Sequence, residues 1–123
     1  MREIKFRGYD EENNVFRYGY YTMLQSGARL YDAIIVEDKD ADQRLTSYYI
    51  HNHKTVGQYT GLKDKNGEEI YEGDILAWDD GKGDPWLIAW NENECRYTDY
   101  SPKNKAIIIG NIHENPELLE EMK

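Results

Sequence analysis

Hydrophobic and polar residues alternate along most of this chain, a pattern typical of half-buried β-strands. The first half carries four such stretches, at residues 4–7, 15–24, 28–36 and 45–50. One face of the second stretch carries Phe16, Tyr18, Tyr20 and Leu24. Tyr48 and Tyr49 are adjacent in the fourth stretch, so they are expected on opposite faces. The alternation therefore predicts β-structure throughout the first half.

The second half combines shorter apolar runs with frequent turn residues. The sequence Asp64-Lys65-Asn66-Gly67 predicts a tight turn, because Asp and Asn side chains bond nearby backbone groups and Asn-Gly tolerates positive φ. Asp74 follows Gly73 and is expected to bond backbone N–H groups at the next bend. We interpret this segment as two short strands joined by tight corners.

Two further elements are predicted towards the end of the chain. Alternation from Trp86 to Trp90 indicates one strand entering a core, and residues 95–100 are expected to return beside it. Asn115 is a good helix cap and Pro116 suits the first helical position, where its missing N–H costs nothing. One short helix is therefore expected at the C-terminal end.

The predicted fold is mostly β. We expect an N-terminal β-strand region at residues 1–55, packed on a small SH3-like β-barrel at residues 56–123 that ends in the short helix. No Gly/Ser-rich or Pro-rich linker separates the two regions, so they are expected to pack together. The alternative is that the whole chain forms one compact unit.

Composition narrows the classes of partner. The chain has 123 residues and a net charge of −9, which opposes non-specific binding to nucleic acid or to an anionic membrane. We find no apolar run of membrane-spanning length and no signal-peptide core, and the single cysteine, Cys95, permits no internal disulfide. The sequence predicts a soluble protein located in the cytoplasm.

Three segments resemble one protein family. GQYTGLKDKNGEEIYEGDIL (57–76) and IIIGNIHENPELLE (107–120) resemble the YopX family of phage and prophage proteins. IKFRGYD (4–10) is similar to that family's start, with Gly8-Tyr9 in place of Ala-Trp, and His113 stands where tyrosine is usual. The resemblance implies a small, mostly β protein encoded by a phage or prophage, in the cytoplasm of its bacterial host. It implies no activity that can be assigned to residues.

Catalytic and metal-binding patterns are weak. His51 and His53 would share a face if their strand continued, which makes them weak candidates for a zinc site, but no third ligand stands at a telling spacing. Cys95 lies between Glu94 and Arg96, a mixed charge environment that favours a structural cysteine over a nucleophile. We assign no catalytic residue, no metal and no cofactor, and we expect the protein not to be an enzyme.

Tyrosine is the most abundant aromatic residue, with 11 tyrosines against 2 phenylalanines. Because tyrosine suits surfaces where one end of the ring stays wet, this excess favours a protein-binding or self-associating module. The alternative functions are a nucleic-acid-binding barrel, which the net charge disfavours, and, less favoured, a small metal-dependent enzyme. The predicted interaction surface consists of Tyr59, Lys63, Lys65, Tyr71 and Glu72.

Overall fold

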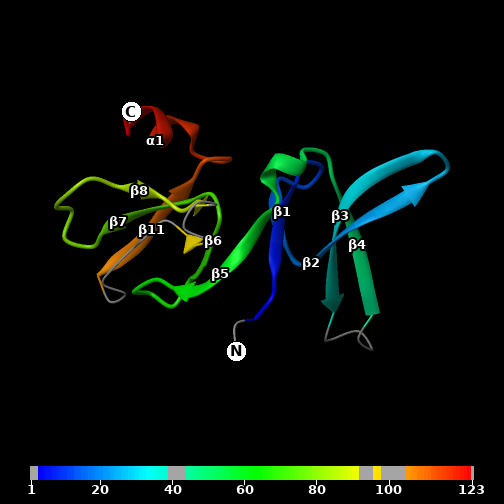
Figure 1. Ribbon diagram of the computed structural model, residues 1–123, viewed down its shortest axis with the longest axis horizontal. Helices are drawn as coiled ribbons and strands as arrows, with labels where there is room; N and C mark the ends of the chain where they lie inside the picture. The colour runs from blue at the N-terminus through cyan, green and yellow to red at the C-terminus, as the bar shows by residue number, and fades with distance from the viewer. Residues whose placement is uncertain (1–2, 39–43, 92–95, 98–104, 123) are drawn as a thin grey trace. The chain divides into compact units, whose positions relative to one another are not determined.

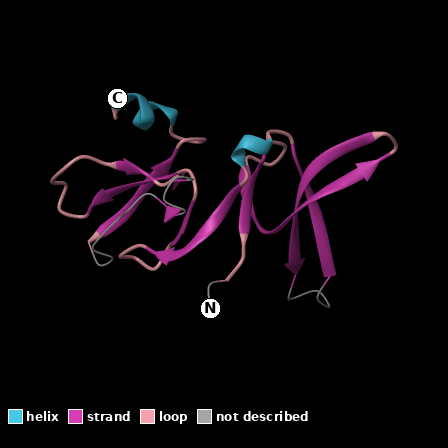
Figure 2. Ribbon diagram, in the orientation of Figure 1, coloured by secondary structure: helices cyan, strands magenta, loops and turns pink. Residues whose placement is uncertain are grey.

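The computed structural model describes residues 3–38, 44–91, 96–97 and 105–122 (Figure 1). The chain divides into two compact units, Met1–Gln58 and Tyr59–Lys123, here called unit 1 and unit 2. Strands dominate both, and the helices of the described residues are a 3₁₀ turn, η1 (His53–Thr55), and α1 (Pro116–Glu121) (Figure 2). The prediction of a mostly β protein with a short C-terminal helix is confirmed. Within these residues we find no helix with the length and apolarity that crossing a membrane requires.

Unit 1 is an antiparallel sheet in the order β4-β3-β2-β1. Its strands are β1 (Phe6–Asp10), β2 (Val15–Ser26), β3 (Arg29–Asp38) and β4 (Arg44–Ile50). The long β2 changes partner: its residues up to Gly19 pair with β1, and those from Tyr20 pair with β3. A Cβ at Gly19 would lie 2.1 Å from the carbonyl oxygen of Ile35, so only glycine allows the two strands to approach this closely.

The core of unit 1 lies on the side of the sheet that carries Gly8, Ile34 and Ile50. Both isoleucines are buried, and each burial stabilises the fold by about 2 kcal/mol. A Cβ at Gly8 would lie 3.0 Å from the nearest side-chain carbon of each isoleucine. The backbone of β1 is therefore in close contact with β3 and β4 at this point.

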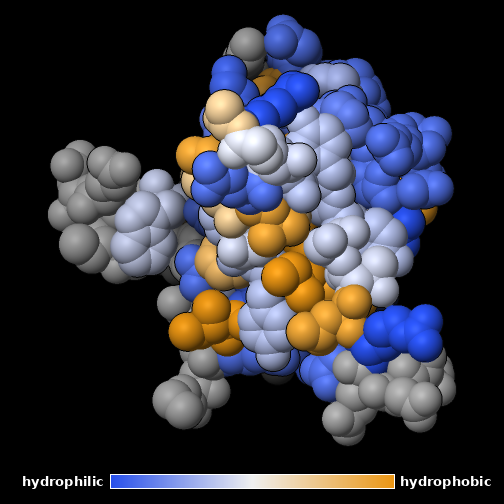
Figure 3. Space-filling view, turned by 90° about the vertical axis from the view of Figure 1, so that its right-hand side faces the viewer, coloured by the Kyte–Doolittle hydropathy of each residue, from blue (hydrophilic) through white to orange (hydrophobic). Residues whose placement is uncertain are grey.

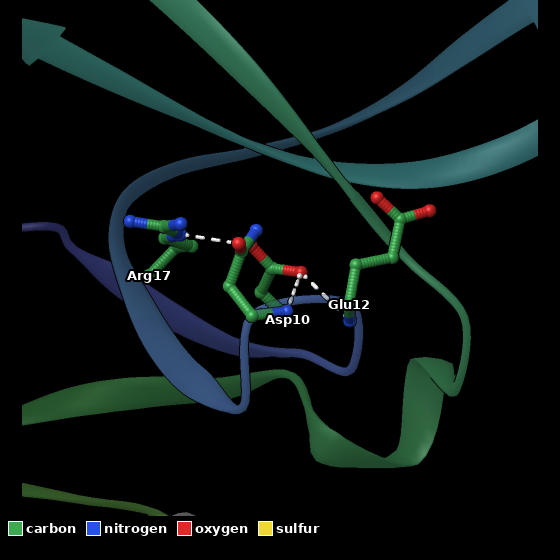
Figure 4. Close-up of polar contacts among 4 residues, drawn as sticks. Asp10, Glu12 and Arg17 are labelled. Atoms are coloured by element: carbon green, nitrogen blue, oxygen red, sulfur yellow. Dashed lines mark hydrogen bonds and ion pairs between the residues drawn. The ribbon is translucent and has the colours of Figure 1, made fainter.

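Asp10 holds the turn between β1 and β2 (Figure 4). Its carboxylate accepts hydrogen bonds from the backbone N–H of Glu12 (3.1 Å), the side-chain amide of Asn13 (2.8 Å) and Nε of Arg17 (3.0 Å). Burial alone would raise the pKa of this carboxyl, but the hydrogen bonds from Asn13 and Arg17 outweigh it and lower the pKa below its ordinary value of 3.8. Asp10 is therefore ionised at neutral pH.

Unit 2 contains short strands in small sheets. The strands are β6 (Glu69–Tyr71), β7 (Asp74–Trp78), β8 (Trp86–Leu87), β9 (Trp90–Asn91), β10 (Arg96–Tyr97) and β11 (Ala106–Asn111). β5 (Gly57–Lys63) begins in unit 1, where Gly57 and Gln58 pair with β1, and its later residues pair with β6 in unit 2. The orders β11-β7-β8 and β10-β9 describe the other two sheets. One hydrophobic core cluster contains four buried residues: Ile70, Leu76, Ile88 and Ala106.

Buried side-chain oxygens hold the turns of unit 2. Asp64 accepts hydrogen bonds from the backbone N–H groups of Asn66 (2.8 Å), Glu68 (2.9 Å) and Ile108 (3.0 Å). Asp74 accepts one from the N–H of Tyr71 at 2.8 Å, which confirms its expected role at the bend. The two carboxylates thus replace the water that these backbone donors would otherwise need.

The structure differs from the prediction in three places. The SH3-like barrel is not confirmed, because no sheet closes into a barrel within the described residues. The strand expected over residues 86–90 is split: the backbone of Ile88 bonds Gly73 and Asp74, and Trp90 then pairs with β10 instead of β7. Asn115 makes no side-chain capping bond to the backbone of the helix it precedes; its Oδ1 accepts from the backbone N–H of Asn111, and its Nδ2 donates to Oε1 of Glu117.

Candidate functional site

The unit 1 sheet carries an apolar surface on the side opposite its core. Residues directly opposite each other in an antiparallel pair share a face, so Tyr20 lies beside Ile35, and Leu24 beside Tyr31. On β4, the odd-numbered residues lie on this same side, because Tyr49 pairs with Ala33. We call the following side chains the aromatic face: Tyr20, Leu24, Tyr31, Ile35, Leu45 and Tyr49.

The aromatic face is accessible to a partner. Tyr20 is 59% exposed, Leu45 63% and Tyr49 36%, whereas Ile34 on the core side is fully buried. The view in Figure 3 looks onto unit 1, where hydrophobic and near-neutral side chains gather from the centre to the lower part and hydrophilic ones lie mainly at the top and on the right. Soluble proteins rarely leave contiguous apolar surface open to water unless another molecule contacts it.

Aromatic rings at one end of the face pack against each other. The rings of Tyr31 and Tyr49 meet edge to face with centroids 5.1 Å apart, and the ring of His51 lies 4.3 Å from that of Tyr49. A shallow hollow of about 340 Å³ opens beside them, lined by Ser26, Arg29, Tyr31 and Tyr49. The contacts order these side chains, so that less conformational entropy is lost when a partner covers them.

Charge is sparse on the aromatic face. Among the described residues of β2, β3 and β4 that point to this side, only Arg29 and Glu37 are charged. The whole chain has 24 acidic and 15 basic residues in 123. The face is therefore depleted in charge and enriched in aromatic rings, the combination that distinguishes the centre of protein–protein interfaces.

Several charged groups of the sheet make their contacts on the opposite side. Arg17 lies over the ring of Tyr48, with 4.0 Å between its guanidinium carbon and the ring centroid, and it also bonds Asp10. The hydroxyl of Tyr21 donates to Asp32, and this hydrogen bond raises the pKa of Tyr21 above its ordinary value. These contacts stabilise the core side and engage its charged groups away from the aromatic face.

The residues predicted as an interaction surface are divided between the core and the surface of unit 2. Tyr59 is 5% exposed and Tyr71 only 1%, and their rings pack with centroids 5.5 Å apart. Lys63 and Lys65 are exposed, and Glu72 is half-buried. Lys65 forms an ion pair with Asp79. The two tyrosines are thus core residues, and the role of this segment in binding stays a prediction.

The geometry required for the candidate metal site is not formed. β4 ends at Ile50, so the strand that would place His51 and His53 on one face does not continue; His53 begins the turn η1 instead. Both histidines are exposed, and the described residues contain no group of three His, Cys, Asp or Glu side chains that could hold a metal ion. Cys95 lies outside the described residues.

Part of the aromatic face was predictable from the sequence. Alternation placed Tyr20 and Leu24 on one face of a strand and Tyr49 opposite Tyr48, and the strand register confirms both predictions. Ile35 and Leu45 were not predicted for this surface. Both sides of these strands carry apolar residues, so alternation alone does not show which side another element covers. Charge gave a signal only in β4, where Leu45, Ser47 and Tyr49 are all uncharged, because both sets of alternate positions in β3 carry charged residues.

Comparisons with known proteins show which family and which solved structure this chain resembles. A family model described as "YopX protein" matches residues 5–120, which include most of both units. The crystal structure of protein EF1440 from Enterococcus faecalis is similar at 27% sequence identity, with 97% of this chain and 99% of that chain covered and a TM-score of 0.59. No curated protein matches.

Proposed function

This chain belongs to the YopX family, and we propose that it is a non-enzymatic, phage-type protein that binds other proteins or further copies of itself through the aromatic face. The origin in a phage or prophage and a cytoplasmic location are parts of the same proposal. The observation that carries it is the exposure of Tyr20, Leu45 and Tyr49 together on one nearly uncharged side of a sheet.

The energetics of that surface favour a protein partner. Exposed apolar area contributes about 25 cal/mol per Å² when it is removed from water, and tyrosine adds a hydroxyl that keeps the surface compatible with solvent before binding. The low charge means that few ions need to be desolvated on association. Aromatic side chains at the centre of an interface typically supply most of its binding energy.

The buried acidic groups support a structural role for the most distinctive segment. Asp64 and Asp74 lie in GQYTGLKDKNGEEIYEGDIL, and both carboxylates accept hydrogen bonds from backbone N–H groups. A carboxylate that holds a turn in this way is not positioned to transfer protons to a substrate. These contacts are the reason for proposing binding instead of catalysis.

A comparison of matched surface variants tests the proposal. In the face variant, Tyr20, Leu45 and Tyr49 are replaced by serine; in the control variant, Trp90 and Ile109, which are exposed apolar residues of unit 2, are replaced by serine. Immobilised wild type and both variants are exposed to a lysate of the bacterial host, and bound proteins are quantified by mass spectrometry. Circular dichroism verifies that all three are folded.

We expect wild type and control to enrich the same proteins, the chain's own soluble copies included, and the face variant to lose at least about tenfold of that enrichment. Undiminished enrichment by the face variant would show that the aromatic face is not the binding surface. A loss in the control variant alone would place binding on unit 2. Enrichment of nothing by any of the three would remove the support for a binding function.

A further inference from the structure

The strand β4 forms an edge of the unit 1 sheet. It stands at the end of the order β4-β3-β2-β1, and no strand of the described residues pairs with its other side. Its seven residues pair with β3 without a bulge, and five of them are exposed. Natural edge strands are usually protected by lysine, proline, a bulge or a covering element, because their free backbone groups can pair with another chain. The sequence RLTSYYI contains neither lysine nor proline.

Charge indicates which kind of molecule can pair with this edge. Two copies of a chain with net charge −9 repel each other, so they can approach only where carboxylates are few. β4 contains no acidic residue and one basic residue, Arg44, and among the described residues of β2, β3 and β4 only one acidic residue, Glu37, points to the same side as the aromatic face. A strongly basic partner would instead be attracted to the acidic surfaces elsewhere. β4 therefore suits a second copy better than a basic protein.

We propose that β4 of one copy pairs with β4 of a second copy, antiparallel, about a two-fold axis at Ser47. This register uses the whole strand, since Ser47 is the central residue of Arg44–Ile50. Leu45 then lies opposite Tyr49 of the second copy, and Arg44 opposite Ile50 of the second copy. No like charges face each other, and the aliphatic–aromatic pair is a favourable cross-strand contact.

The pairing also joins the two aromatic faces. Because odd-numbered residues of β4 would pair with odd-numbered residues of the second strand, Tyr49 and Leu45 of both copies come to lie on the same side of one continuous sheet. Isologous contacts of this kind close after two subunits and do not propagate into fibres. This inference rests on the proposed function and specifies it: the first partner of the surface is another copy of the chain.

Cysteine cross-linking tests the register. In a Cys95→Ser background, Ser47→Cys would bring two thiols together across the two-fold axis, where Cα atoms of an antiparallel pair are about 4.5–5.5 Å apart and a disulfide can form. Thr46→Cys is the matched control, since Thr46 is also exposed but faces Tyr48 of the second copy. Thr46 of the second copy lies diagonally across the strand pair. The distance between the two Thr46 Cα atoms therefore exceeds the roughly 7 Å that a disulfide can span.

We expect mild oxidation to convert Ser47→Cys into a covalent dimer at least about tenfold faster than Thr46→Cys. Equal rates for the two variants, or faster cross-linking of Thr46→Cys, would overturn the proposed register. Sedimentation equilibrium supplies a second test without cysteine. Ser47→Glu places two carboxylates against each other at the axis and is expected to weaken dimerisation at least about tenfold, whereas Ser47→Thr preserves it.

The outcomes separate this inference from the proposed function. If wild type is monomeric at every concentration while the face variant still loses bound proteins, the β4 pairing is wrong and the binding function stands. If a dimer forms but Ser47→Glu leaves it intact, the copies associate elsewhere, and again only the β4 pairing fails. If wild type is monomeric and no protein is captured, both proposals fail.

Discussion

At the scale of single residues, Asp64 has more backbone contacts than its place in a surface turn suggests. Its Oδ1 accepts from the N–H groups of Asn66 and Glu68, and its Oδ2 accepts from the N–H of Ile108, so one carboxylate joins the turn to β11. Asp64→Asn preserves the shape but turns an NH₂ group towards one of these donors. We expect a loss of about 1–3 kcal/mol in the free energy of unfolding, measured by urea denaturation followed through tryptophan fluorescence.

The neighbouring Glu68→Gln is the control for Asp64, because the Glu68 side chain is exposed in the same turn. Its free energy of unfolding is expected to remain within about 0.5 kcal/mol of wild type. Equal losses in the two variants would show that the effect comes from charge in this acidic segment and not from the three hydrogen bonds.

Asp10 predicts a pH dependence of stability in unit 1. Its pKa in the folded chain lies below the ordinary 3.8, so its contribution is complete above that value and is lost as the pH falls through the lower, folded pKa. A carboxyl-detected NMR titration is expected to give a midpoint below 3.8 for wild type and a higher one for Arg17→Ala, which removes one of the donors. A midpoint that Arg17→Ala leaves unchanged would contradict this account of the pKa.

At the scale of elements, the switch of β2 from β1 to β3 depends on Gly19. Gly19→Ala would bring a methyl group to 2.1 Å from a backbone carbonyl oxygen, which cannot be relieved by rotating a side chain. The strands must separate, and we expect a loss of about 3 kcal/mol or more in the free energy of unfolding, measured by urea denaturation of unit 1 through circular dichroism.

The turn residue Gly27 provides the comparison for Gly19. It has a φ of +63°, but no atom beyond its chain neighbours lies within 4 Å of the position that a Cβ would occupy. Gly27→Ala therefore carries only the cost of a left-handed backbone, about 1 kcal/mol. A Gly27→Ala variant as unstable as Gly19→Ala would show that backbone conformation, and not crowding between β2 and β3, controls this part of the sheet.

Elements with strict alternation were predicted well from the sequence. The four strands of unit 1 begin and end within about three residues of the predicted positions. Burial of one face requires an apolar side chain at every second residue, and this alternation is visible in the sequence. The strand expected from Trp86 to Trp90 was wrong, since its alternation continues through a change of partner that depends on backbone bonds from Ile88 to the distant Gly73 and Asp74. Contacts of that range leave no local signal in the sequence.

At the scale of the whole molecule, distinctive sequence and exposed surface lie in different units. The segment 57–76 carried the clearest family resemblance, and the structure shows why its residues are specific: Asp64 and Asp74 hold turns, and Tyr59 and Tyr71 pack in the core. The aromatic face comes from β2, β3 and β4 of unit 1, which lie outside the three segments that carried the resemblance. Its composition was visible in the sequence, but its exposure depends on which side β1 covers, and this is a property of the fold.

Salt dependence distinguishes self-association from nucleic-acid binding. Two copies with net charge −9 repel each other, and raising the salt from about 0.05 M to about 0.5 M shortens the Debye length from about 14 Å to about 4 Å. Screening should therefore strengthen dimerisation, on the order of fivefold in the association constant, as measured by sedimentation equilibrium. Binding to DNA or RNA would change in the opposite direction, since added salt opposes the release of counterions. A dimer that dissociates as salt rises would contradict contact through a surface poor in charge and would indicate ionic attraction between the copies.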